Sequence, residues 1–299
     1  MKVKFWGVRG SIPTPGRQTV RYGGNTPCLE IRLDDDELII FDAGSGIRNF
    51  GDDLINKGAS VKAHLLITHP HWDHIQGFPF FKPAFISGNE LTIFATERPE
   101  KSLSEVIAEQ MNRIYFPVQL NELKAKIHFK PLKEEGVIQL PGCTVKTIYV
   151  NHPGFTLGYR LEYKGKSFVY ISDNEPYDRG AGAFFANFEP EVRQRFDSTT
   201  GDPNRRIFEF CRDADVLVHD ATYTPEEYID RVGWGHSHYL FTLRIAAEAE
   251  VKRLILFHHD PTHDDDKVDD MLQKCKKEIK TRRYRFECEA AVEGMVLKV

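Results

Sequence analysis

The chain has 299 residues, of which 41% are apolar and 28% charged, so it is long enough to bury a large core. Lysine and arginine total 40 against 44 acidic residues, and the resulting charge of −4 disfavours a protein that binds nucleic acid by neutralising many phosphates. The sequence has no apolar run near the roughly 20 residues that cross a bilayer and no signal-peptide pattern, so we expect a cytoplasmic protein that contacts no membrane. The five scattered cysteines suggest no disulfide framework.

The first half of the chain is expected to form mainly short strands. Apolar runs bounded by turn residues predict strands over 2–8, 27–33, 37–44 and 62–68. Helical spacing predicts one helix over 46–58, ending at Gly58, and a second, amphipathic helix over 99–114 with Pro99 near its start.

In the second half, strands and helices alternate only late in the chain. Strands are predicted over 124–130, 143–150, 157–163, 167–172, 214–221 and 251–259. Helices are predicted over 224–232, 237–250 and 264–280. This pattern favours a layered α/β sandwich over a simple doubly wound sheet. We see no repeat and no linker, so we expect a single domain over residues 1–299, with an insert at about 174–213.

The strongest local signal is Thr-His-Pro-His-Trp-Asp-His at 68–74, directly after a predicted strand. It places three imidazoles and one carboxylate within six positions. Neutral imidazole and carboxylate are normal ligands of Zn²⁺ and similar ions, and loops at strand ends present such groups freely. The motif therefore indicates a metal site.

These residues resemble the defining His-x-His-x-Asp-His motif of the metallo-β-lactamase superfamily. The motif is matched in full, and further family positions are matched along most of the chain. The resemblance implies an α/β four-layer αβ/βα sandwich, with two mixed sheets flanked by helices. It also implies two divalent ions, with Zn²⁺ as the first expectation and Mn²⁺ or Fe²⁺ as alternatives. The implied ligands are His69, His71 and His152 for one ion, Asp73, His74 and His258 for the other, and Asp173 between the two.

Two assignments near the proposed metal site have competing interpretations. Asp42, before the motif, is expected to orient a histidine rather than to bind metal. His258 and His259 are adjacent, so only one of them should face the site, and family position favours His258.

The later motifs resemble the phosphodiesterase branch of the superfamily, which includes ribonuclease Z. They are His-Asp-Ala-Thr at 219–222 and Gly-His-Ser-His at 235–238. The implied catalytic residues are Asp73, which would orient or deprotonate a water, and His236, which would protonate the leaving oxygen. Asp220 would hold the ring of His236 and favour its protonated form. The alternative for His236 is a cap on the helix that begins near residue 237.

The amino-terminal segments 5–13 and 22–26 look like those of bacterial hydrolases of this fold that are similar to cyclic-nucleotide phosphodiesterases. Arg9, Ser11 and Asn25 could contact phosphate or support the metal ligands. Turn architecture built on the neighbouring glycines explains the same segments equally well.

The short segment between His152 and Asp173 bears on the size of the substrate. Ribonuclease Z enzymes grip transfer RNA with a long arm rich in glycine and proline, and only the 20 residues 153–172 lie between these two positions. We therefore expect a small anionic phosphodiester, first a 3′,5′-cyclic nucleotide, and large RNA less so. The alternatives are transfer-RNA 3′-end processing and thioester or lactone hydrolysis. A metal-binding sensor without activity is disfavoured by the complete ligand set.

Two further segments have open roles. The insert at 174–213 could be a lid, a homodimer contact or inert packing. The aromatic segment 77–85, with residues 115–117, is expected to be core, and base stacking is its alternative.

Overall fold

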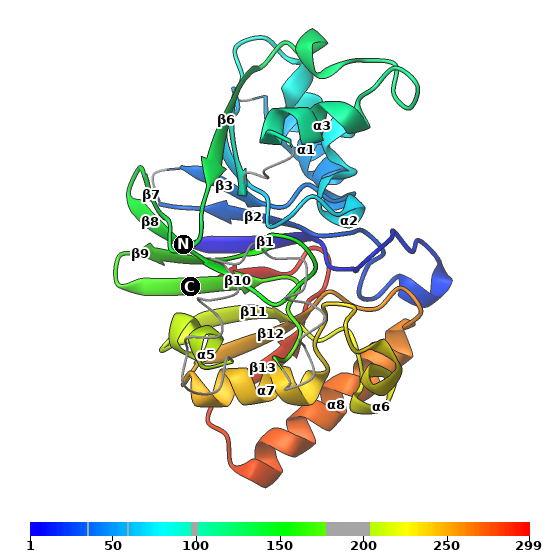
Figure 1. The fold of residues 1–299 in the computed structure, drawn as a ribbon, viewed down its shortest axis with the longest axis vertical. Coiled ribbons are helices and arrows are strands. Elements are labelled where there is room, and N and C mark those ends of the chain that lie inside the picture. Colours follow the sequence, from blue (N-terminus) through cyan, green and yellow to red (C-terminus); the bar gives the residue numbers. More distant parts are fainter. Residues whose placement is uncertain (35, 59, 97–100, 178–203) are drawn as a thin grey trace.

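The computed structural model describes residues 1–34, 36–58, 60–96, 101–177 and 204–299. Two seven-stranded sheets face each other, and helices cover the outer face of each (Figure 1). The predicted four-layer α/β sandwich is confirmed. None of the helices in the described part of the chain combines the length and apolarity needed to cross a membrane.

The first sheet is built mainly from the amino-terminal half. Its strands are, in spatial order, β14 (Val296–Lys298), β1 (Lys2–Gly7), β2 (Cys28–Arg32), β3 (Leu38–Phe41), β4 (Lys62–Leu66), β5 (Glu90–Thr96) and β6 (Lys126–Leu132). Strands β3 to β6 are parallel, and the others are antiparallel. The accompanying helices are α1 (Gly46–Asn56), α2 (Trp72–Ile75) and α3 (Leu103–Gln110).

The second sheet contains the remaining strands. They are, in spatial order, β13 (Glu287–Ala290), β12 (Arg253–Phe257), β11 (Val216–Asp220), β10 (Lys166–Ile171), β9 (Leu157–Tyr163), β8 (Cys143–Tyr149) and β7 (Val137–Leu140). Strands β10 to β13 are parallel. The accompanying helices are α5 (Arg205–Cys211), α6 (Pro225–Tyr228), α7 (Tyr239–Glu248) and α8 (Asp265–Arg282). Short 3₁₀ turns lie at Arg17–Thr19, Phe78–Phe80, Lys82–Phe85, Leu120–Glu122 and Ile229–Arg231.

Aromatic side chains fill the space between the sheets. The ring of Phe41 on β3 lies 5.2 Å from that of Tyr159 on β9 and 5.3 Å from that of Tyr170 on β10, measured between centroids. All three side chains are fully buried. Burial of each such ring contributes roughly 1.5–3 kcal/mol. This contact therefore holds the two sheets together and fixes the position of the strand ends of one sheet relative to those of the other.

The two chain ends meet in one sheet, because β14 pairs with β1 through Leu297 and Val3. We propose on this ground that residues 1–299 form the single domain expected from the sequence. Most of the insert expected at 174–213 lies outside the described residues, which omit 178–203. The interpretations of this insert as a lid or a dimer contact therefore stay predictions. Within its described part, α5 occupies 205–211.

Several elements differ from the prediction. Strands β5, β7, β13 and β14 were not predicted; the last two and β7 are short strands near sheet edges, where the apolar pattern is weak. The helix predicted over 99–114 spans only 103–110, because Ser102 and Glu105 form a capping box that sets its start. Residues 97–100, including Pro99, lie outside the described part. All five cysteines are buried, and no disulfide joins any of them within the described residues.

Candidate metal centre

The predicted site residues all follow strand ends at one edge of the sandwich. His69 and His71 lie in the loop between β4 and α2, and Asp73 and His74 lie within α2. His152 follows β8, Asp173 follows β10, and His258 follows β12. The carboxyl ends of parallel strands meet at one edge of a sheet, and the two sheets bring two such edges together. Residues more than 180 positions apart, such as Asp73 and His258, thereby come into contact.

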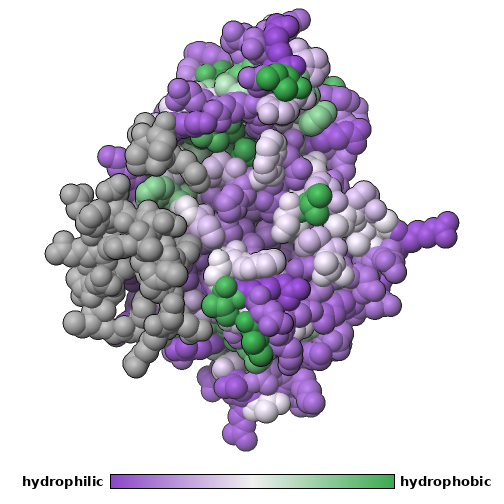
Figure 2. Space-filling model, turned by 45° about the vertical axis from the view of Figure 1, so that its right-hand side comes forward, coloured by the Kyte–Doolittle hydropathy of each residue, from purple (hydrophilic) through white to green (hydrophobic). Residues whose placement is uncertain are grey.

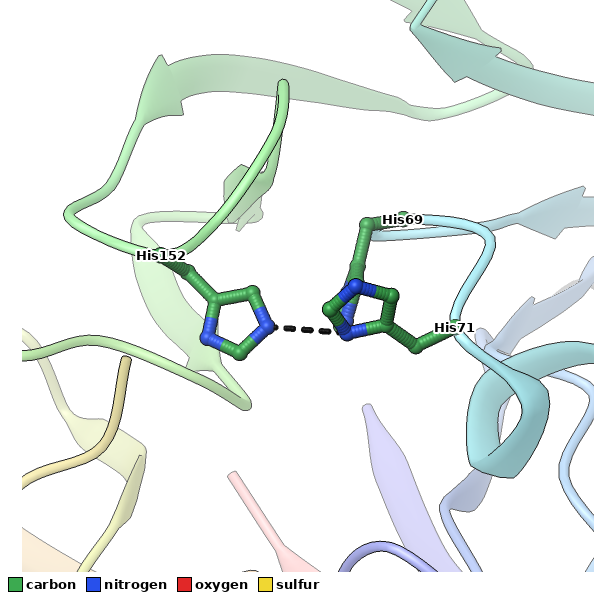
Figure 3. Close-up of side chains that lie close together, drawn as sticks. All are labelled: His69, His71 and His152. Carbon is green, nitrogen blue, oxygen red and sulfur yellow. Dashed lines mark hydrogen bonds between the residues drawn. The ribbon is translucent and has the colours of Figure 1, made fainter. Parts of the chain in front are cut away.

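Three histidines converge from opposite loops. His69 and His71 point from the loop after β4 toward His152, which comes from the facing loop (Figure 3). Nδ1 of His71 lies 3.0 Å from Nε2 of His152. Nδ1 of His152 donates to the carbonyl of Gly235 at 2.7 Å, so Nε2 is the atom aimed into the centre.

A second trio lies beside the first. Oδ2 of Asp73 is 3.1 Å from Nε2 of His258 and 3.3 Å from Nε2 of His74. Asp173 faces both trios, because Oδ1 is 3.3 Å from Nε2 of His74 while Oδ2 is 3.7 Å from Nε2 of His152. In each trio the ligand atoms lie within 4.8 Å of one another, and the same holds for His69, His74 and Asp173.

Buried partners orient these ligands. Oδ2 of Asp42 accepts a hydrogen bond from Nδ1 of His74 at 2.8 Å and another from the Tyr170 hydroxyl at 2.8 Å. This is the orienting contact expected of Asp42. The amide of Ser11 donates to Oδ2 of Asp73 at 2.7 Å. The ligand rings and carboxylates therefore have fixed directions before any ion binds.

Protonation differs across the cluster. Burial lowers the pKa of His152 to about 4 and that of His69 well below its usual value, so both rings are neutral near pH 7. Burial alone would raise the pKa of Asp73 and Asp173, but the surrounding histidines, His74 and His258 foremost, outweigh it and hold both carboxyls well below their usual range. Burial opposes charge on His74 too, yet the adjacent carboxylates Asp73, Asp173 and Asp42 raise its pKa.

This donor set fits divalent cations. Nε2 of His69, Nε2 of His74 and Oδ1 of Asp173 are buried, and each lacks a hydrogen-bond partner among the described residues. Buried polar atoms without partners are costly and rare, and here three of them face one centre. The neutral imidazoles of His69 and His152 and the ionised carboxylates of Asp73 and Asp173 match the ligand preference of Zn²⁺ and similar ions.

Of the two adjacent histidines, His258 faces the trio that contains Asp73. His259 is turned away, and its Nε2 donates to the carbonyl of Ala291 at 2.9 Å. Gly10 lies directly against the ring of His258. The structure thus selects His258 as the residue that reaches the site.

The expected contact between Asp220 and the ring of His236 is not a hydrogen bond. Oδ2 of Asp220 is 3.6 Å from Nδ1 of His236 and instead accepts the amide of Ser237 at 2.8 Å. Burial raises the pKa of Asp220 and lowers that of His236, which opposes the charge pairing expected from the sequence. Asp220 holds His236 through the backbone. His236 is also not a helix cap, since α7 begins at Tyr239 with His238 in the cap position.

The amino-terminal residues divide between support and architecture. Arg9 is fully buried and donates to the carbonyls of Gly23, Asp260 and His263, so it holds loops together and is not free to bind phosphate. Asn25 pairs with Glu293. Of Arg9, Ser11 and Asn25, it is Ser11 whose backbone amide donates to a proposed ligand, Asp73.

The aromatic segment after the motif is mainly core, as expected. Phe78 and Phe81 are fully buried, whereas Phe80 is exposed and packs edge-on against Phe116. On the face brought forward in Figure 2, hydrophobic side chains of the described residues form small separate groups within a mainly hydrophilic surface. Sequence reasoning missed Glu175, a buried carboxylate two positions after Asp173; its closeness to a proposed ligand was the available signal.

Comparisons with known proteins agree with this fold. Residues 38–192 match the family model of the beta-lactamase superfamily domain. Ribonuclease Z of Thermoplasma acidophilum is 28% identical over 313 aligned positions, which cover 93% of this chain and 92% of that protein. Two solved structures share the fold: the metallo-β-lactamase fold protein YhfI of Bacillus subtilis and the short form of human tRNase Z.

The YhfI structure has a TM-score of 0.66 at 18% identity and covers 99% of this chain and 98% of its own. The human structure has a TM-score of 0.63 at 19% identity and covers 100% of this chain and 99% of its own. At these identities the two structures show the fold. The family match covers more than half of the sequence and contains the His-x-His-x-Asp-His motif. The chain therefore belongs to the β-lactamase superfamily, as a metal-dependent hydrolase with the metallo-β-lactamase fold.

Proposed function

We propose that this hydrolase cleaves a small cyclic phosphodiester, first a 3′,5′-cyclic nucleotide. The proposed ligands of its two divalent ions are His69, His71, His152, Asp73, His74, His258 and Asp173, with Zn²⁺ before Mn²⁺ or Fe²⁺. Divalent ions held this way supply Lewis-acid polarisation of a phosphoryl oxygen and make water more acidic.

The protein's own residues have distinct parts in this proposal. Asp73, fixed by the Ser11 amide, accepts a proton from the attacking water or orients it. His236 donates a proton to the leaving alcohol oxygen, a role that requires the negative charge of a bound phosphodiester to raise the pKa that burial lowers in the free protein. Nδ1 of His236 is buried, lies 3.8 Å from Oδ2 of Asp173 and 3.6 Å from Oδ2 of Asp220, and has no hydrogen-bond partner among the described residues.

The observation that carries the small-substrate proposal is the tight hairpin between His152 and Asp173. Strands β9 and β10 are joined by Lys164 and Gly165 alone, both with positive φ, as in a two-residue hairpin turn. No part of the fully described segment 153–172 extends as an arm that could grip a large RNA.

Two exposed tryptophans favour a substrate that carries a base. Trp72 stands between His71 and Asp73 and is 66% exposed, and Trp234 precedes Gly235 and is 61% exposed. Their two loops meet at the proposed ligand His152, because Nδ1 of His71 lies 3.0 Å from Nε2 of His152 and Nδ1 of His152 donates to the carbonyl of Gly235. Exposed rings at the mouth of a site offer stacking faces to a nucleobase.

Transfer-RNA 3′-end processing is the second candidate, favoured by the ribonuclease Z relative that aligns over 93% of this chain. A turnover panel with the metal-loaded protein separates the two. It contains 3′,5′-cyclic mononucleotides, a cyclic ribose phosphate, a linear dinucleotide and precursor transfer RNA, with Asp73→Ala as the inactive control. Preferred hydrolysis of cyclic nucleotides is expected. Cleavage of precursor transfer RNA alone at physiological salt would establish the second candidate instead.

A further inference from the structure

We infer that Glu175 is a positioning residue for His236, acting through the backbone of the loop that precedes it. The inference rests on the proposed function, in which His236 protonates the leaving oxygen. Glu175 lies just after Asp173 and is only 5% exposed. Its carboxylate reaches across to the loop 233–235, which comes from a distant part of the sequence.

Three donors converge on this carboxylate. Oε1 accepts the Tyr228 hydroxyl at 2.9 Å and the Gly233 amide at 2.6 Å, and Oε2 accepts the Gly235 amide at 2.8 Å. All three contacts need an acceptor, which a carboxylate provides on both oxygens. An amide side chain would turn a donor toward at least one of these donors.

The backbone of Glu175 is itself fixed. Its amide donates to the carbonyl of Asn151 at 2.7 Å, and Nδ2 of Asn151 donates back to the carbonyl of Glu175 at 3.0 Å. The Asn151 amide also donates to Oδ1 of Asn174 at 3.1 Å. The carboxylate therefore projects from the same rigid unit that carries the proposed ligands His152 and Asp173.

The loop that it holds has little stiffness of its own. Gly233 and Gly235 have φ values of +89° and +87°, a region that glycine enters freely, and a free glycine loop would sample many conformations. A Cβ at Gly235 would lie 2.3 Å from Nδ1 of His152, so no other residue fits there without displacing that ring.

His236 is consequently held from both sides by carboxylates. Glu175, after β10, binds the amide of Gly235, and Asp220, at the end of β11, binds the amide of Ser237. The ring between them lies 5.1 Å from that of His152 and 4.8 Å from that of His258. A misplacement of about 1 Å at a proton donor costs up to roughly 10²-fold in rate, so losing one carboxylate should weaken proton donation specifically.

The test measures how kcat depends on the leaving group. Aryl methyl phosphodiesters with p-nitrophenol, a stable anion, and phenol, which needs a proton, are compared in the wild type, Glu175→Gln and His236→Ala. For Glu175→Gln we expect kcat for the phenyl ester to fall about tenfold or more, with kcat for the nitrophenyl ester, KM and metal content unchanged. The exposed Glu248→Gln is the matched control and should match the wild type.

A double variant completes the test. Adding Glu175→Gln to His236→Ala should cause no further loss, because both changes remove the same proton donation. If Glu175→Gln lowered kcat equally for both esters, or lowered the metal content, the inference would be overturned and Glu175 would be a support of the metal ligands. An unchanged kcat for the phenyl ester in this variant would also overturn it. Failure of the proposed function gives a different result, since His236→Ala would then leave the leaving-group dependence unchanged.

Discussion

Gly10 lies against the imidazole of His258, although 248 positions separate them in the sequence. A Cβ built on Gly10 would be 2.3 Å from both Cε1 and Nδ1 of the ring, closer than any real contact. The same loop carries Ser11, whose amide fixes Asp73. The amino-terminal loop thus supports one trio of proposed ligands by its shape as well as by a hydrogen bond.

Gly10→Ala is expected to push the ring of His258 away from Asp73 and to weaken binding of one ion by about 10–100-fold, with a matching loss of activity. Metal content by mass spectrometry after dialysis, together with turnover of bis(p-nitrophenyl) phosphate, checks this. Gly16→Ala is the control, because its Cβ would meet only Oγ1 of Thr19 at 4.0 Å. Full metal content in Gly10→Ala would contradict the assignment of His258.

The neighbouring histidines should separate cleanly on substitution. His258→Ala removes a proposed ligand and should lower metal content by one ion per chain. His259→Ala should keep both ions and instead destabilise the fold by about 1–3 kcal/mol, because it leaves the buried carbonyl of Ala291 without its donor. Metal analysis and denaturant unfolding of both variants, each in the metal-loaded form, measure the two effects. The opposite pattern would make His259 the ligand.

The proposed ligands could be identified from sequence because metal chemistry leaves a dense local signal. His69, His71, Asp73 and His74 lie within six positions. His152, Asp173 and His258 have no such cluster around them; the family resemblance implied them, and each lies at or just after the end of a predicted strand. The layered fold was predictable for a related reason, since buried strands such as β3 and β12 carry continuous apolar runs.

Contacts set by tertiary structure could not be predicted this way. Family position favoured His258 over His259, but the residues alone do not show the left-handed conformation of His258 (φ +58°) in which Nε2 of its ring lies 3.1 Å from Asp73. The amide of Ser237, rather than the ring of His236, donates a hydrogen bond to Asp220, and this depends on the path of the backbone after Gly235. Arg9 is a residue type that commonly binds phosphate, but here it is fully buried, and its Nε and Nη1 donate to carbonyl oxygens.

Glu227 should contribute to acid sensitivity. Burial would raise its pKa, but the Thr224 amide, His263 and Lys267 outweigh burial and lower the pKa to about 2. Because the folded-state pKa lies below the ordinary 4.5, this stabilisation is fully present above pH 4.5 and is lost as the pH falls toward 2. Wild type should therefore have a higher free energy of unfolding than Glu227→Gln at pH 6, and this difference should shrink as the pH falls to 3. Urea unfolding of both proteins across this pH range measures it. The exposed Glu248→Gln should show a smaller difference throughout.

Trp72 and Trp234 should govern recognition of the base. Stacking on one aromatic ring is worth about 1–3 kcal/mol, so Trp72→Ala and Trp234→Ala should each raise KM for a 3′,5′-cyclic nucleotide by about 5- to 150-fold. Arg231 lies 6.0 Å from the ring of Trp234 and supports its orientation, so Trp234→Phe should retain most of the affinity. A cyclic ribose phosphate without a base is the discriminating substrate, because its KM should be the same in all these variants. Val20→Ala, at another exposed apolar side chain, controls for general surface effects. If KM rose equally for the substrates with and without a base, the tryptophans would act by shaping the loops that carry their neighbours His71 and Gly235. They would then no longer support a nucleotide as the substrate.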